Sequence, residues 1–325
     1  MKVLRKQPNK DFIILNLTDP QLGDPEWAEG HMNRAVIEYT VAQLIERTKP
    51  DLITISGDLA WAGYTLAYDL LAELLEQYQI PWAPVWGNHD NQGGAECIDR
   101  IVNRYMAYPH FLYEKGDPVL GNGNYVIAIE EEGKIVEALI MMDSHNRVEY
   151  VREGREEPTT DAKLIPEQLE WYRQQIRSLK EKGCDSATMI LHIPLYAFQE
   201  ASRAAFKEGL DLTKVTLQDA EGSSCWQVGY ENSVGVQYER ICSYPEEDGV
   251  FAVIKEEGVT KRVIAGHDHV NNWIITYQGV QLIYGLKTGA GCYWNPILNG
   301  GTLLKVGKEG VYEVKHEYVD ATHLL

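Results

Sequence analysis

Residues 80–90 read Ile80-Pro81-Trp82-Ala83-Pro84-Val85-Trp86-Gly87-Asn88-His89-Asp90, an apolar run that ends abruptly in polar residues. The apolar part, residues 81–86, predicts a buried strand. Two earlier segments share this arrangement, with predicted strands at residues 12–17 and 52–55 that are also followed by polar turns. Between these strands, residues 33–49 and 66–78 have the hydrophobic periodicity of helices. The resulting βαβαβ order is typical of a layered α/β fold with a parallel portion in its sheet.

The later part of the chain carries further strand patterns. Strands are predicted at residues 124–130, 135–142 and 187–192, with a helix at 166–181 between the last two. Closely spaced strand candidates then follow, joined by Gly-containing turns, at 262–265, 273–277, 280–284, 301–306 and 311–318. This spacing predicts a meander-like C-terminal portion. No Pro- or Ser-rich linker divides the chain, so we expect one domain over residues 1–325, with insertion loops at about 93–123 and 209–245.

The composition argues against several partners. Against 30 Lys and Arg stand 48 Asp and Glu, for a net charge of −18, and binding to a phosphate backbone needs clustered basic residues, so we expect no long nucleic acid. No apolar run reaches the roughly 18 residues that span a bilayer, and residues 1–11 contain no apolar signal core. We therefore expect a cytoplasmic protein without a membrane partner, whose oligomeric state the sequence leaves open.

The cysteines are odd in number and lie far apart. Because no Cys-x-x-Cys pair occurs, neither a disulfide framework nor a thiolate zinc site is indicated. The five are Cys97, Cys184, Cys225, Cys242 and Cys292.

Five short polar motifs follow predicted strands directly, where ligand sites of α/β sheets gather. They are Asp19-Pro20-Gln21, Gly57-Asp58, Gly87-Asn88-His89-Asp90, His192-Ile193-Pro194 and Gly266-His267-Asp268-His269. Taken singly, the first two are compatible with ordinary turns, and His192 is compatible with a hydrogen-bonded core histidine. Together they offer oxygen and nitrogen ligands of the kind that Mn, Fe and Zn accept. A centre with two ions about 3.5–4 Å apart needs one shared carboxylate, and Asp58 suits that role.

The five motifs together resemble the calcineurin-like metallophosphoesterase superfamily, whose pattern runs DxH, GD, GNH[DE], H and GHxH. The blocks around Asn88, His192 and His267 look most like the branch related to purple acid phosphatases. The resemblance covers nearly the whole chain and implies a four-layer αββα sandwich, in which helices flank two mixed β-sheets. It also implies two divalent metal ions, Mn, Fe or Zn, with Mn favoured.

The resemblance carries ligand roles onto individual residues. It implies a first metal site made by Asp19, Asp58 and His269, with Gln21 at a further ligand position. It implies a second site made by four residues, which are Asp58, Asn88, His192 and His267. Asp58 would bridge the two ions, and the nucleophile would be a metal-bridging water or hydroxide, available near neutral pH because two cations lower its pKa.

Two residues next to the ligands are candidate catalytic groups. His89 falls where the superfamily places a histidine near the leaving group, as general acid or as an electrostatic contact to phosphoryl oxygens. Its alternative role is that of a hydrogen-bond donor behind the ligands. Asp90 is expected to orient His89.

Two positions depart from the superfamily pattern. Gln21 stands in place of a histidine, and its amide oxygen is a weaker ligand than imidazole. Trp61, three residues after Asp58, stands where purple acid phosphatases carry the tyrosine that gives their colour. An indole N–H is only a donor and cannot bind a metal, so a colourless enzyme is implied.

The sequence therefore predicts a metal-dependent hydrolase that cleaves a phosphomonoester or phosphodiester, on a small or peptide-borne substrate. The alternative is a catalytically weak or inactive protein of the same fold that binds a protein partner. Gln21 is the one departure among the ligand positions. The presence of His89 and of the other six ligand residues favours an enzyme, because a scaffold has no use for a histidine near the leaving group. His145 either touches substrate or caps a turn, and the second role is preferred.

Overall fold

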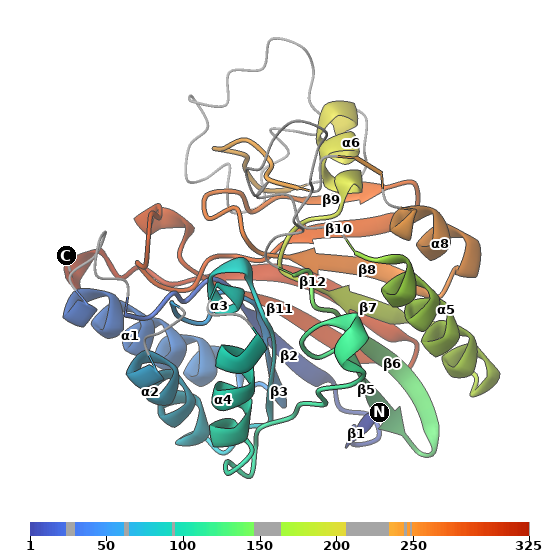
Figure 1. The fold of residues 1–325 in the computed structure, drawn as a ribbon, viewed down its shortest axis with the longest axis horizontal. Helices are drawn as coiled ribbons and strands as arrows, with labels where there is room; N and C mark the ends of the chain where they lie inside the picture. The colour runs from blue at the N-terminus through green and yellow to red at the C-terminus, as the bar shows by residue number, and fades with distance from the viewer. Residues whose placement is uncertain are drawn as a thin grey trace.

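The computed structural model describes residues 1–23, 30–61, 65–92, 95–145, 164–205, 234–243, 246–247 and 249–324. Two mixed sheets lie at its centre (Figure 1). The smaller has the order β12 (Gly310–Tyr318), β11 (Gly300–Gly307), β2 (Phe12–Leu17), β3 (Leu52–Ser56) and β4 (Trp82–Val85). The larger has the order β1 (Lys2–Arg5), β5 (Tyr125–Glu131), β6 (Lys134–Met141), β7 (Ala187–Ile190), β8 (Thr260–Ala265), β10 (Val280–Tyr284) and β9 (Ile274–Tyr277).

The smaller sheet packs against three helices, α1 (Gly30–Thr48), α2 (Thr65–Glu76) and α4 (Ala95–Tyr105). One hydrophobic cluster contains Val41 of α1, Leu71 of α2 and Ile101 of α4 together with the apolar residues of β2, β3 and β4. Ile127 and Leu139 of the larger sheet belong to the same cluster. The smaller sheet is therefore covered by helices on one face and by the larger sheet on the other.

The larger sheet is buried on both faces. Alternate residues of a strand point to opposite faces of a sheet, and in this sheet both sets are apolar. Ile127 and Ile129 of β5 join the cluster between the sheets, whereas Val126 and Ala128 join a second cluster. That second cluster also contains apolar residues of the helices α5 (Pro166–Glu181), α6 (Tyr196–Ala205) and α8 (Val250–Glu257). The layer order is helix, sheet, sheet, helix, as the sequence predicts.

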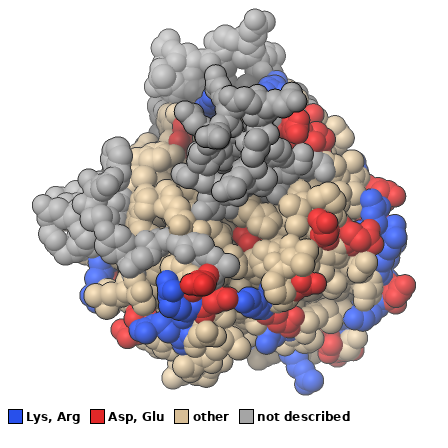
Figure 2. Space-filling view, in the orientation of Figure 1, with Lys and Arg blue, Asp and Glu red and all other residues tan. Residues whose placement is uncertain are grey.

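The helices α5 and α8 are held together by ion pairs at the surface. Arg173 and Arg177 of α5 lie 3.3 and 2.8 Å from the Glu257 carboxylate of α8. On the described part of the face drawn in Figure 2, acidic and basic side chains alternate along this edge. None of the described helices is both long enough and apolar enough to cross a bilayer.

The C-terminal strands do not form the meander that the sequence predicted. β10 lies between β8 and β9, parallel to β8 and antiparallel to β9. β11 and β12 leave this sheet, and β11 pairs antiparallel with β2. The pairing supplies hydrogen-bond partners to β2, which would otherwise expose an unpaired edge of the smaller sheet.

The two predicted insertions differ from the expectation. The first contains α4, whose residues Ile98 and Ile101 are buried in the core. The second falls largely on residues 206–233 and 244–245, which lie outside the described residues. Its described part forms two antiparallel bridges, one from Val234 to Ile274, the first residue of β9, and one from Gln237 to Asn271, just before β9.

Candidate metal centre

The predicted ligands all lie at or near the carboxyl ends of strands. Asp19 and Gln21 follow β2, and Asp58 follows β3. Asn88 and His89 open the short helix α3 (Asn88–Asn91), which comes after β4. His192 follows β7, and His267 and His269 follow β8. Both sheets therefore deliver side chains to one region, because β2, β3 and β4 run parallel, as do β7 and β8.

The first predicted site brings Asp19, Asp58 and His269 together. All three side chains are buried, and a potential ligand atom of each lies within 4.8 Å of the others. His269 Nε2 lies 3.4 Å from Asp19 Oδ1, a buried oxygen that has no hydrogen-bond partner. The Nδ1–H of His269 donates to the carbonyl of Tyr293 at 2.8 Å, which leaves Nε2 free to bind a metal. A buried carboxylate oxygen without a partner is costly, and a cation would satisfy it.

The second predicted site centres on His192. Its Nδ1–H donates to the carbonyl of Ser56 at 2.8 Å, while Nε2 faces Asn88 Oδ1 at 2.9 Å and Asp58 Oδ2 at 3.4 Å. The ring of His267 lies edge-on to that of His192, with the ring centroids 5.1 Å apart. Asp58 is thus near ligands of both predicted sites, as a bridging carboxylate requires.

The electrostatics of the site favour a cation. Burial alone would raise the pKa of Asp58, but His192 and His89 outweigh burial and hold it well below its usual range. Burial alone would lower the pKa of His192, but the Asp58 carboxylate raises it to about 10, so without a metal the ring is protonated and a bound cation would take the place of the Nε2 proton. Burial and the nearby His192 lower the pKa of His267 to about 3, so its ring is neutral and able to bind a metal. The donor set fits two divalent cations.

The Gln21 side chain faces two ways. Its amide Nε2 donates to Asp58 Oδ2 at 3.1 Å, and its Oε1 accepts from Lys287 Nζ at 3.2 Å. Lys287 is buried, and sequence reasoning missed it as a site residue. The sequence does mark Lys287 as unusual. It is the one charged residue between 280 and 291, a stretch that begins with a buried strand.

The backbone around the ligands is strained. Asp19, Gln21, Asp58 and His267 all have positive φ angles, between 45° and 76°. Residues other than glycine rarely adopt this conformation, and it occurs preferentially at functional sites. At these residues the chain turns sharply after each strand, and the turns direct the four side chains towards one region.

A glycine next to the ligands permits their close approach. A Cβ atom on Gly87 would lie 2.1 Å from Asp58 Oδ1, so Gly87→Ala should push the Asp58 carboxylate away. A displacement of about 1 Å can lower turnover about 100-fold, and we expect a loss of that order together with weaker Mn²⁺ binding. Calorimetric titration and steady-state kinetics measure both. Gly307→Ala is the control, since its Cβ would lie 3.2 Å from the Tyr312 ring and 3.9 Å from the Gly310 carbonyl, outside the candidate site. Unchanged metal binding in Gly87→Ala would contradict the expectation.

His89 lies beside the shared carboxylate. Its backbone N–H donates to Asp58 Oδ1 at 2.9 Å, and its Nε2 lies 3.9 Å from Asp58 Oδ2. Its ring packs on that of Trp61, with the centroids 3.9 Å apart. His89 Nδ1 and Trp61 Nε1 are both buried without a hydrogen-bond partner. Trp61 therefore positions the ring of His89 by close packing, with the two ring planes tilted by 43°.

The carboxylate of Asp90 accepts hydrogen bonds from two backbone N–H groups and a tyrosine hydroxyl. The donors are the backbone N–H of Gly87 at 2.8 Å and of Leu59 at 3.1 Å, and the Tyr68 hydroxyl at 2.8 Å. Burial and the neighbouring Asp58 raise the pKa of Asp90 to about 7. Asp90 thus braces the two loops that carry Asp58 and Asn88, which differs from the orienting contact with His89 that we expected.

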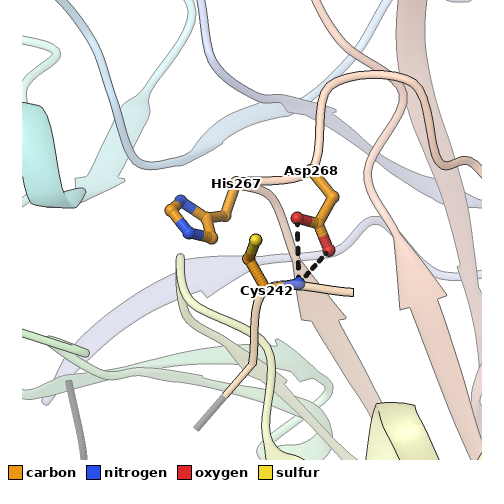
Figure 3. Close-up of side chains that lie close together, drawn as sticks. All are labelled: Cys242, His267 and Asp268. Carbon is orange, nitrogen blue, oxygen red and sulfur yellow. Dashed lines mark hydrogen bonds between the residues drawn. The ribbon is translucent and has the colours of Figure 1, made fainter. Parts of the chain in front are cut away.

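Asp268, between the two histidines of the last motif, also has a bracing position. Both of its carboxylate oxygens accept from the backbone N–H of Cys242, at 3.2 and 3.1 Å (Figure 3). The His267 ring leaves the same loop in another direction. The described cysteines, Cys97, Cys184, Cys242 and Cys292, form no disulfide with one another, and Cys225 lies outside the described residues.

His145 lies in a network at the end of β6. Its N–H donates to Asp143 Oδ1 at 2.9 Å, as in a capped turn, and its Nε2 lies 2.7 Å from Gln168 Oε1 of α5. These contacts are those of a turn residue that joins β6 to α5.

Known proteins resemble this chain in sequence and in fold. Probable inactive purple acid phosphatase 14 of Arabidopsis thaliana is 25% identical over 321 residues, which cover 88% of this chain and 72% of that protein. Phosphatase DCR2 of Saccharomyces cerevisiae is 24% identical over 295 residues, covering 85% of this chain and 45% of that protein. The crystal structure of a dimetal phosphatase from Danio rerio shares the fold, with a TM-score of 0.60, 14% identity and coverage of 95% and 98% of the two chains. The sequence profile described as calcineurin-like phosphoesterase matches residues 12–271, a range that contains every predicted ligand. The chain therefore belongs to the calcineurin-like phosphoesterase family.

Proposed function

We propose that the protein is a metal-dependent hydrolase of phosphomonoesters or phosphodiesters. Asp19, Asp58 and His269 would hold one divalent cation, and Asp58 would share a second with the remaining ligands, which are Asn88, His192 and His267. The unpartnered Asp19 Oδ1 is the observation that carries this proposal, since it lies buried among potential ligands of one ion. Mn²⁺ is the favoured ion, because the donors are carboxylate, amide and imidazole groups.

The chemistry divides between the ions and the side chains. Two bound cations would lower the pKa of a water molecule, and they would stabilise the negative charge that develops during an in-line displacement at phosphorus. His89 protonates the leaving oxygen or contacts the phosphoryl group, and Trp61 holds its ring in place. Asp90 keeps the two loops at a fixed separation through its hydrogen bonds to Gly87 and Leu59.

A scaffold that binds a protein partner is the second candidate. Three relatives from Arabidopsis thaliana carry the word inactive in their names, and the Gln21 amide oxygen accepts a hydrogen bond from Lys287. A scaffold, however, does not require a histidine packed against Trp61 and held 3.9 Å from a shared carboxylate. Hydrolysis is therefore the function that the site supports best.

Two chromogenic esters separate the candidates. Metal-free protein should release p-nitrophenol from its phosphate monoester or from its phosphate diester when Mn²⁺ is added, and EDTA should abolish the release. Asp58→Asn protein, purified in the same way, controls for contaminating phosphatases. Release that persists in the Asp58→Asn preparation, or no release from either ester, would favour the scaffold.

Gln21→His tests the position that departs from the family pattern. An imidazole at this position is a better metal ligand than the amide, so we expect the weaker Mn²⁺ dissociation constant to fall about tenfold. The turnover number need not rise, because a more electron-rich ion acidifies water less. Titration of metal-free wild-type and variant protein measures both constants. Two equally tight sites in the wild type that Gln21→His leaves unchanged would contradict the expectation.

A further inference from the structure

Lys287 is a buried lysine at the edge of the candidate metal centre, and it is 2% exposed. Its ammonium donates to two neutral oxygens, the carbonyl of Asp19 at 2.7 Å and Oε1 of Gln21 at 3.2 Å. Burial lowers its pKa to about 8. Taking an ammonium out of water is costly unless hydrogen bonds or an opposite charge compensate it, and here both acceptors belong to residues of the first site.

The Lys287 ammonium fixes the orientation of the Gln21 amide. An ammonium is only a donor, so it binds the amide oxygen and turns the amide nitrogen away. That nitrogen donates to Asp58 Oδ2 at 3.1 Å. The three groups form a chain in which each donates to the next, from ammonium to amide to carboxylate. The chain ends on the carboxylate that both ions are expected to share.

The orientation has a consequence for metal binding. In this arrangement Gln21 presents N–H groups to the site, and an N–H cannot bind a cation. Its oxygen, the one atom that could bind, lies against a positive charge. The first ion is then left with Asp19, Asp58 and His269, whereas the second keeps four protein ligands.

We propose that Lys287 is a positioning residue that acts through Gln21: it holds the Gln21 amide as a donor to Asp58 and keeps its oxygen off the first metal ion. The first ion is therefore the weaker of the two. The inference rests on the proposed dinuclear centre and adds to it the reason for unequal occupancy.

Lys287→Met tests the inference in the full-length protein. Methionine is unbranched and of similar length, and it releases the Gln21 oxygen. Titration of metal-free protein with Mn²⁺, followed by calorimetry, should show the weaker dissociation constant at least tenfold lower, with less than a threefold change in the tighter one. Lys305→Met is the control, because Lys305 pairs with Glu313 on the β11–β12 hairpin. An unchanged weaker constant would overturn the proposal.

Gln21→Leu provides a second test that does not depend on the stability of Lys287→Met. If Gln21 is not a ligand, its removal should change the weaker constant less than threefold, and a rise of tenfold or more would overturn the proposal. In the Gln21→Leu background, Lys287→Met should have no further effect. An equal tightening there would show that Lys287 acts by direct charge repulsion and not through Gln21. Absence of any Mn²⁺ binding by the wild type would instead refute the proposed centre itself.

Discussion

Replacing Asp58 by asparagine should remove at least one bound ion and lower turnover by several orders of magnitude. Asp58 lies within 3.4 Å of His192 Nε2 and belongs to the cluster that contains Asp19 and His269. Asparagine keeps the shape but loses the negative charge that holds two cations close together. Metal analysis of the purified protein and steady-state kinetics with p-nitrophenyl phosphate measure the two effects.

Asp69→Asn is the matched control for this substitution. Asp69 lies on α2 and pairs with Arg104 of α4, so the same chemical change is made outside the candidate site. Its metal content and turnover should equal those of the wild type. Near-native turnover in Asp58→Asn would refute the dinuclear mechanism in which Asp58 is the shared ligand.

His89→Asn should leave the metal content intact and lower the turnover number. If His89 is a general acid, the loss for a poor leaving group should be about 100-fold to 10,000-fold. The loss should be smaller for p-nitrophenolate, which departs without a proton. The wild-type and variant rates are to be compared over a series of aryl and alkyl phosphates.

Two further measurements define the role of His89. Trp61→Phe keeps an aromatic ring against His89 and removes the unpartnered indole N–H, so it should preserve the dependence on leaving group. An equal loss for good and poor leaving groups in His89→Asn would exclude His89 as the acid and leave it an electrostatic contact.

Local patterns predicted much of the fold. The predicted helix at residues 166–181 coincides with α5, because Pro166 fixes its first turn and its buried residues recur at helical spacing. The predicted strands lie within a few residues of those in the structure. The order of the C-terminal strands could not be predicted, since the insertion of β10 between β8 and β9 depends on pairing between distant segments.

The sequence predicted those site residues that directly follow a strand. It did not predict site residues whose position depends on contacts with distant parts of the chain. Residue type and position at a strand end marked Asp19, Asp58 and His269 as candidate ligands, and the resemblance to the superfamily implied that they hold one ion. The structure brings the three side chains together. Lys287, in contrast, reaches a carbonyl 268 residues away in the sequence, and no local pattern encodes that contact. The position of Asp90 also depends on a distant residue, the Tyr68 hydroxyl.

Anomalous diffraction from crystals soaked in Mn²⁺ tests the dinuclear centre most directly. It locates each ion independently of any assay and shows which side chains bind it. The proposed centre predicts two peaks about 3.5–4 Å apart with Asp58 between them, and the stronger peak beside His192 and Asn88. A single peak, or peaks remote from Asp58, would contradict it.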